Sequence, residues 1–286
     1  MFMAKLVIKV DIDTYRGMKE GVPRIARVLD KYSVPASFFV SFGPDRSGLA
    51  LLQLLRPRFL KKMIRTNAYG MYGLKTALYG VILPPPMIGT GFPDTVKNLA
   101  ACGHEVACHA WDHRLWQDWL FIMSQKSIDA WFAKMVDAYV SITGKKPSGF
   151  GAPGWLMDER TLKVAGSFDF TYLSCSRASK PFVFRENGML EIPSNLPCIE
   201  EVGVGGVLEA LKENAASQTV QVLPVHAEVE GGAYQEAFDQ MLNSALVHNY
   251  RIITCIDAAR DIDQSGLELR ALKRGMIPGR AFACAV

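Results

Sequence analysis

Near its start the chain has the sequence Lys5-Leu-Val-Ile-Lys-Val-Asp-Ile-Asp13, a short apolar run that ends in two aspartates. Its β-branched residues predict a buried first strand over Lys5–Val10. Apolar residues at helical spacing follow over Gly21–Tyr32, and a second apolar run covers Ala36–Ser41. A strand, a helix and a strand at this spacing predict a parallel βα unit.

The same alternation continues along the chain. We expect further helices over 94–102, 127–143 and 233–247, and further strands over 105–108, 219–225 and 251–254. A chain of 286 residues can form one large α/β domain. The pattern therefore predicts a single domain over 1–286, folded as a complete or incomplete (β/α) barrel.

Composition narrows the class of protein. The chain is 49% apolar and 21% charged, as is usual for a globular protein, and its net charge of +4 is too small to predict a nucleic-acid partner. Six cysteines lie scattered without CxxC pairs, which favours buried thiols in a reducing compartment. The N-terminus lacks the pattern of a signal peptide, so we expect a cytoplasmic protein.

One segment, 46–93, interrupts the alternation. It contains no Asp or Glu, is rich in Leu, Met and Tyr, and carries seven basic residues: Arg46, Arg56, Arg58, Lys61, Lys62, Arg65 and Lys75. Prolines and glycines near its end argue against a membrane-spanning helix. The segment is typical of an insert that rests on an anionic lipid surface, and the alternative is a packed lid or an oligomer contact.

Candidate catalytic residues gather after the predicted strands. Asp11 and Asp13 lie two residues apart, so their side chains point to the same side of the strand, where a cation or a proton would relieve their repulsion. Alternatively, they only cap the following turn. His109 and His113 are spaced so that both would lie on one face of a helix and share one cation, although this spacing alone is weak evidence of a metal site. Together with Asp13 they form a set of one carboxylate and two imidazoles.

His226 follows the apolar run Val220–Val225 at the end of another strand. It is either a general acid or a structural histidine, and Glu228 or Glu230 could orient it or contact a substrate. These parts predict hydrolysis: a divalent metal on Asp13, His109 and His113 activates water and a carbonyl, Asp11 accepts a proton, and His226 protonates a departing amine.

The motifs around these residues resemble those of the polysaccharide deacetylase family, also called the NodB homology or carbohydrate esterase 4 family. They are Val10-Asp-Ile-Asp13, His109-Ala-Trp-Asp-His113 and Leu223-Pro-Val-His226. The resemblance implies a distorted (β/α) barrel of seven or eight strands. It implies the same roles: Asp11 as base, His226 as acid, and one divalent metal ion on Asp13, His109 and His113. This ligand set suits zinc first and tolerates manganese, cobalt or iron.

A closer resemblance covers nearly the whole chain and includes Val10–Gly17, Phe42–Asp45 and Val225–Gly231. It is to the branch of the family that deformylates a 4-formamido-arabinose on undecaprenyl phosphate, in lipid A modification and polymyxin resistance. This implies a lipid-linked amino-sugar substrate and peripheral association with the inner membrane through 46–93. Arg16, Trp155 and Glu228 become candidate substrate contacts.

The chain departs from the wider family at one point. The family's third motif carries an arginine that orients the base, whereas the matching segment here is Gly151-Ala-Pro-Gly-Trp155. Two other functions stay open: an N-deacetylase acting on another sugar or amide, and a non-catalytic protein that binds a sugar phosphate or a lipid.

Overall fold

In this computed structural model, residues 3–50, 78–280 and 282–286 are described. A ten-stranded, mostly parallel sheet forms the centre, in the order β10-β6-β7-β5-β4-β3-β2-β1-β8, with β9 beside β1. The strands of this sheet are β1 (Lys5–Ile12), β2 (Ser37–Ser41), β3 (Glu105–Ala110), β4 (Gly149–Phe150), β5 (Tyr172–Leu173), β6 (Phe182–Phe184), β7 (Leu190–Glu191), β8 (Gln221–His226), β9 (Arg251–Ile253) and β10 (Leu269–Arg270). A separate hairpin joins β11 (Arg274–Gly275) and β12 (Cys284–Ala285).

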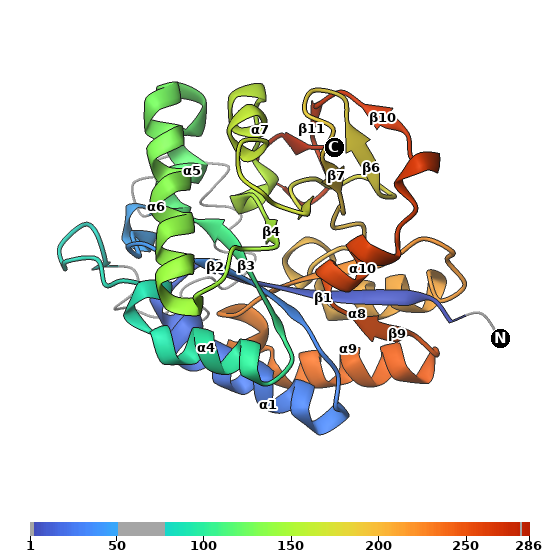
Figure 1. Ribbon diagram of the computed structural model, residues 1–286. Coiled ribbons are helices and arrows are strands. Elements are labelled where there is room, and N and C mark those ends of the chain that lie inside the picture. Colours follow the sequence, from blue (N-terminus) through green and yellow to red (C-terminus); the bar gives the residue numbers. More distant parts are fainter. Residues whose placement is uncertain (1–2, 51–77, 281) are drawn as a thin grey trace.

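Helices surround the sheet, with α4, α1 and α9 along its lower side in Figure 1 and α6 at its left. They are α1 (Val22–Tyr32), α4 (Pro93–Ala101), α5 (His113–Trp119), α6 (Gln125–Thr143), α7 (Glu159–Ala165), α8 (Ile199–Glu213), α9 (Gln235–Val247) and α10 (Cys255–Asp261). The structure also has two π-helical turns, η1 (Gly17–Gly21) and η7 (Val229–Ala233), and the short 3-10 turns η4 (Gly89–Gly91), η5 (Leu120–Ile122), η6 (Pro153–Trp155) and η8 (Gln264–Gly266).

Local sequence explains where the helices begin and end. The hydroxyl of Ser124 accepts a hydrogen bond from the amide of Ser127 and caps the start of α6, which ends at Gly144 with a positive φ. Proline in the first turn begins both α1 and α4. The helices and strands predicted above by residue range are present, with bounds shifted by a few residues. The α/β class and the parallel-rich barrel architecture are therefore confirmed.

The order of the strands decides where the predicted residues meet. β1 is paired with β2 on one side and β8 on the other, and β3 lies next to β2. All these neighbours run parallel, so their carboxyl ends lie at the same edge of the sheet. Asp11, His109 and His226 come from this edge.

Candidate metal centre and active site

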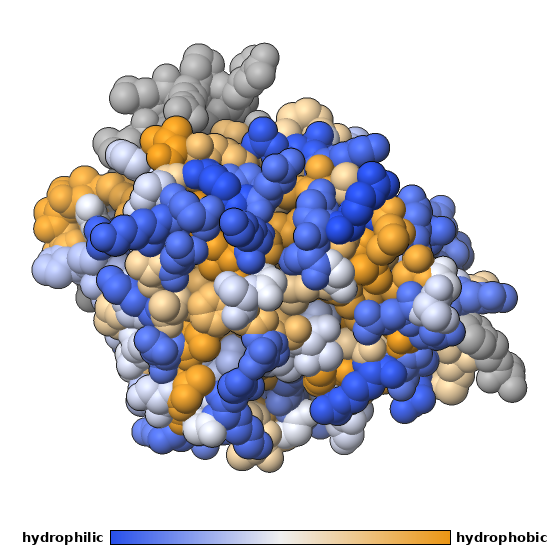
Figure 2. All heavy atoms as spheres, turned by 45° about the horizontal axis from the view of Figure 1, so that its top comes forward, coloured by the Kyte–Doolittle hydropathy of each residue, from blue (hydrophilic) through white to orange (hydrophobic). Residues whose placement is uncertain are grey.

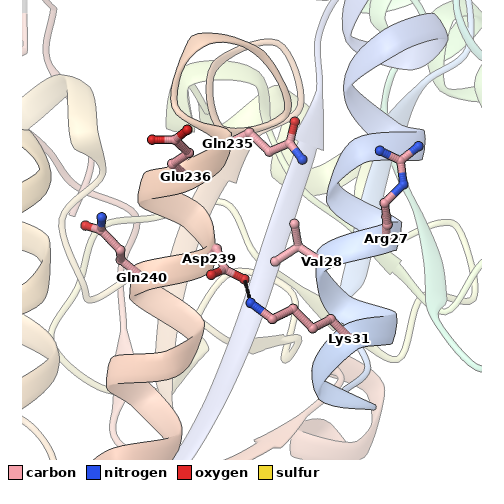
Figure 3. A pocket seen from close by; sticks show the side chains of 7 residues that line it. All are labelled: Arg27, Val28, Lys31, Gln235, Glu236, Asp239 and Gln240. Carbon is pink, nitrogen blue, oxygen red and sulfur yellow. Dashed lines mark hydrogen bonds and ion pairs between the residues drawn. The ribbon is translucent and has the colours of Figure 1, made fainter.

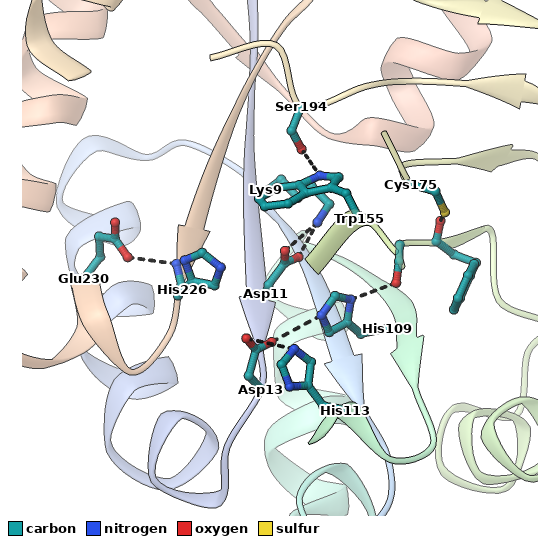
Figure 4. A network of polar contacts seen from close by, with 12 residues as sticks. Lys9, Asp11, Asp13, His109, His113, Trp155, Cys175, Ser194, His226 and Glu230 are labelled. Atoms are coloured by element: carbon teal, nitrogen blue, oxygen red, sulfur yellow. Dashed lines mark hydrogen bonds and ion pairs between the residues drawn. The ribbon is translucent and has the colours of Figure 1, made fainter. Parts of the chain in front are cut away.

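The first strand places three ionisable side chains in a row. Lys9, Asp11 and Asp13 alternate along β1 and its end, so they project from the same side of the strand. Lys9 is fully buried, and Asp11 is 4% exposed. Asp13 lies just beyond the strand, where its carboxylate meets the two histidines (Figure 4).

The two histidines are not on one helix, and that prediction is wrong. His109 lies in β3, which extends to Ala110, whereas His113 is the first residue of α5. Between them Asp112 caps the new helix by accepting a hydrogen bond from the amide of Leu115. The rings nevertheless stack, with centroids 5.3 Å apart and planes inclined by 27°. A strand, a tight turn and a helix start thus bring the imidazoles together.

The carboxylate of Asp13 bridges these rings. Its Oδ1 lies 3.2 Å from His109 Nε2, and its Oδ2 lies 3.1 Å from His113 Nε2. Burial opposes ionisation of Asp13, but the two neighbouring imidazoles, His113 first, lower its pKa well below the usual value. One potential ligand atom from each residue lies within 4.8 Å of the other two.

Two further observations fit a cation at this position. The Oδ1 atom of Asp13 is buried, yet it accepts no well-aligned hydrogen bond from the described residues. His109 Nδ1 lies 2.8 Å from the carbonyl oxygen of Gly151, which can only accept. The imidazole therefore carries its proton on Nδ1 and leaves the lone pair of Nε2 free for a metal. A set of one carboxylate and two imidazoles suits zinc, manganese, iron or cobalt.

Asp11 and His226 are neighbours across two strands. They are register partners in β1 and β8, and the amide of Ala227 donates to the carbonyl of Asp11 at 2.9 Å. Figure 4 shows both side chains beside the Asp13, His109 and His113 cluster. The predicted base, acid and metal ligands thus lie together at one edge of the sheet.

A residue that the sequence analysis missed pairs with His226. Glu200, at the start of α8, places Oε1 2.8 Å from His226 Nδ1. Burial would lower the pKa of His226, but the Glu200 carboxylate raises it well above the usual value. Burial would raise the pKa of Glu200, but the charge of His226 lowers it to about 2. The pairing with Glu200 therefore favours the protonated form of His226.

Glu230 has a different task from the one expected. It accepts a hydrogen bond from the backbone amide of His226 at 2.8 Å and so positions the end of β8. Burial raises the pKa of Glu230 to about 8, so it is largely protonated at neutral pH. The imidazole itself is paired with Glu200.

Lys9 is the second residue that was missed. Its Nζ donates to both carboxylate oxygens of Asp11, at 2.6 Å for Oδ2 and closer for Oδ1. The ammonium also lies 4.5 Å from the ring centroid of Phe39 and 5.8 Å from that of Trp155. Lys9 interrupts the apolar run two positions before Asp11, which is the signal in the sequence that could have identified it.

The three predicted substrate contacts differ in exposure. Arg16 is one-third exposed and donates to Glu20 at 3.2 Å. Trp155 is buried, with its ring 4.0 Å from the guanidinium of Arg280 and its Nε1 hydrogen-bonded to Ser194. Glu228 is 4% exposed, and burial and the nearby charge of Asp13 raise its pKa well above the usual value. Contact of any of them with a substrate stays a prediction.

Part of the basic insert lies outside the described residues, including Arg56, Arg58, Lys61, Lys62, Arg65 and Lys75. Within the described part, Arg46 donates to Asp112 at 2.8 Å and so joins the start of the insert to the histidine turn. Its charge is therefore partly neutralised. Val81, Ile82 and Leu83 expose 46%, 74% and 37% of their surface. Figure 2 shows that apolar areas are interspersed with hydrophilic ones on the face that it draws.

The predicted thiol burial holds for five of the six cysteines. Cys108, Cys175, Cys198, Cys255 and Cys284 are buried and free, whereas Cys102 is exposed at the end of α4. Among the described residues, no helix is long and apolar enough to cross a membrane.

A surface groove between α1 and α9 lies apart from this site. It is lined by Arg27, Val28, Lys31, Gln235, Glu236, Asp239 and Gln240 (Figure 3). An ion pair between Lys31 and Asp239 at 2.6 Å crosses it. None of its residues belongs to the predicted site, and the groove offers no comparable set of metal ligands.

Known proteins resemble this chain in sequence and in fold. Residues 7–173 match the family described as "Polysaccharide deacetylase". Two relatives bear the name "probable 4-deoxy-4-formamido-L-arabinose-phosphoundecaprenol deformylase". The one from Shewanella sediminis is 31% identical and covers 91% of this chain and 88% of its own; the one from Wigglesworthia glossinidia brevipalpis is 34% identical and covers 80% and 84%.

Solved structures share the fold at low identity. A protein of Mycobacterium smegmatis described as a polysaccharide deacetylase superposes with a TM-score of 0.65 at 17% identity, covering 96% of this chain and 95% of its own. An allantoinase superposes with 0.59 at 14% identity and covers 89% of each chain. A pseudoenzyme of the carbohydrate esterase 4 family from Bacillus anthracis superposes with a TM-score of 0.52 at 14% identity, over 89% of this chain and 65% of its own.

Proposed function

Because this chain belongs to the polysaccharide deacetylase family, we propose that it is a metal-dependent hydrolase that deformylates a 4-deoxy-4-formamido-L-arabinose carried on undecaprenyl phosphate. The observation that carries the proposal is the similarity to relatives of that name over most of both chains. The cluster of Asp13, His109 and His113 beside Asp11 and His226 supports it.

The first part of the proposal concerns the metal. Asp13, His109 and His113 would hold one divalent ion, with zinc as the first choice and manganese, cobalt or iron as alternatives. Such an ion supplies Lewis acidity toward the amide carbonyl and lowers the pKa of water. His109 is held ready for it because its Nδ1 proton is donated to Gly151.

Two proton transfers fall to the chain itself. The Asp11 carboxylate accepts a proton from the attacking water while the oxygen of that water bonds to the formyl carbon. When the carbon–nitrogen bond breaks, His226 donates its proton to the leaving nitrogen, so the products are formate and the free amino sugar. Glu200 keeps His226 protonated before this step because it raises the pKa of the imidazole.

The test of this proposal is a comparison of two substrates. Metal-loaded protein is given the lipid-linked 4-formamido sugar and its 4-acetamido analogue, and formate and acetate are measured separately. We expect faster formate release, although one added methyl is worth only about 1–3 kcal/mol in a pocket. Faster acetate release would instead identify an N-deacetylase. Release of neither product would contradict a hydrolase and favour a binding protein.

Replacement of Glu200 tests the origin of the acid. Without the carboxylate, Glu200→Gln lowers the pKa of His226, so the protonated acid is lost at a lower pH. The alkaline limb of the kcat/KM profile should therefore move to lower pH, with a larger loss of activity at pH 8 than at pH 6. Glu209→Gln, on the exposed part of the same helix, should leave the profile unchanged. An unmoved alkaline limb in Glu200→Gln would contradict this account.

We further propose that the protein associates with a membrane surface through segment 46–93. The basic charges of that segment and the exposed side chain of Ile82 support this. Ile82→Asp should weaken binding to vesicles that contain phosphatidylglycerol by roughly tenfold, because one buried aliphatic side chain is worth about 1.5–3 kcal/mol. The control is Val247→Asp, which alters an exposed residue at the end of α9. Equal binding by both variants and the unchanged protein would exclude this role for Ile82.

A further inference from the structure

The family's orienting arginine is absent from Gly151–Trp155, but Asp11 does not lack a cation. We infer that Lys9 is the positioning residue of the general base: from within the same strand it fixes the Asp11 carboxylate for proton transfer. This inference rests on the proposed function for its catalytic meaning, whereas the pairing of Lys9 with Asp11 can be tested without turnover.

The geometry of the Lys9–Asp11 pair holds the carboxylate in one orientation. One ammonium donates to both oxygens of one carboxylate, which fixes the rotation of the carboxylate as well as its place. Among the described residues, no other side chain is hydrogen-bonded to those oxygens. A lone pair on one oxygen remains available to accept the proton of water, since a carboxylate has about four acceptor positions.

The burial of Lys9 also supports its pairing with Asp11. Lys9 has no exposed surface, and a lysine is almost never fully buried unless it is paired. Its ammonium lies over the faces of Phe39 and Trp155, which stabilise a cation at this depth. The aromatic rings and the strand hold Nζ in one place, and its two hydrogen bonds therefore fix the position of the Asp11 carboxylate.

The positions of these residues along β1 connect Lys9 to the rest of the site. Lys9, Asp11 and Asp13 alternate on one side of the strand, and Asp11 is the register partner of His226. The strand thus orders a cation, the base and a metal ligand at intervals of two residues. Any shift of Asp11 would change its distance from both Asp13 and His226, because its neighbours are fixed by the same sheet.

The kinetic test uses Lys9→Met, Asp11→Asn and the double variant. Lys9→Met should keep one metal per chain and lower kcat by about 10²-fold with KM within about threefold, as for a small misplacement of a reacting group. In the Asp11→Asn background the same change should cost no more than about twofold, because the base it positions is already gone. Lys5→Met, at the partly exposed start of the same strand, should match the unchanged protein.

Two outcomes would overturn the inference: unchanged kcat in Lys9→Met, or a double variant whose loss equals the product of the two single losses. The conservative Lys9→Arg variant adds a readout, because restored kcat relative to Lys9→Met requires the cation and not merely a filled volume. If no form of the protein released formate, the proposed function would be overturned. Thermal unfolding tests the Lys9–Asp11 pair without relying on that function.

Thermal unfolding tests the pair itself. Lys9→Met leaves the Asp11 carboxylate buried without its cation and should lower Tm, and Asp11→Asn in that background should recover much of the loss. Losses in Tm that simply add would contradict the pairing, even in a protein that deformylates its substrate.

Discussion

Asp13→Ala is expected to remove the bound metal and to lower kcat/KM by about 10³-fold or more. The carboxylate lies 3.1–3.2 Å from the ring nitrogens of His109 and His113, so it joins the two imidazoles in one cluster. Loss of the metal removes several kcal/mol of transition-state stabilisation, and about 1.4 kcal/mol corresponds to tenfold in rate. Metal analysis and formate release on the same preparation would measure both effects.

The control for this change is Asp137→Ala, which alters an exposed aspartate on α6 and should keep both metal and activity. His113→Ala provides a second test of the same site and should also lose the metal, because it removes an imidazole ligand. Full metal occupancy in Asp13→Ala would show that the ion lies elsewhere or that the protein holds none at this cluster.

Asp11→Asn is expected to keep the metal and lose turnover. The amide has nearly the same shape as the carboxylate but cannot accept the proton from water, and removal of a general base typically costs 10²–10⁴-fold. The metal should remain because Asp11 is not one of the three residues whose ligand atoms cluster. Single-turnover kinetics with metal-loaded protein would separate this chemical effect from substrate binding.

Loss of the metal in parallel with turnover would contradict the separate roles of Asp11 and Asp13. A variant with normal kcat would instead assign the base to another group. Glu228, in the motif that contains His226, is one alternative base, but burial raises its pKa well above the usual value, so it is a poorer proton acceptor.

Much of this arrangement could be predicted from the sequence. The apolar run before Asp11 and Asp13 identified β1, and the run before His226 identified β8, so strand ends that meet at one edge were expected. Register was not predictable, because which residue of β8 faces Asp11 depends on the pairing of strands far apart in the chain. The structure adds that His226 is that partner.

Other features depend on tertiary packing. His109 and His113 have the spacing of a helix, but β3 continues past His109, and periodicity cannot distinguish these cases in five residues. Glu200 gave no local signal, since its role depends on where the start of α8 packs against β8. Lys9 did give one, because a lysine within an apolar strand requires a partner.

The fold by itself does not establish turnover. A pseudoenzyme from Bacillus anthracis shares it with a TM-score of 0.52, and an allantoinase shares it with a TM-score of 0.59. The proposed chemistry therefore depends on particular side chains: the cluster of metal ligands, the Lys9–Asp11 pair and the Glu200–His226 pair. A binding protein would require neither of the two charged pairs.

Formate release before and after metal removal tests the central claim most directly. The protein is depleted with a chelator, supplied with the lipid-linked formamido sugar, and then given one equivalent of zinc. The account predicts no formate from the depleted protein and restored release after zinc, with Asp13→Ala not restored. Undiminished formate release from fully depleted protein would contradict it.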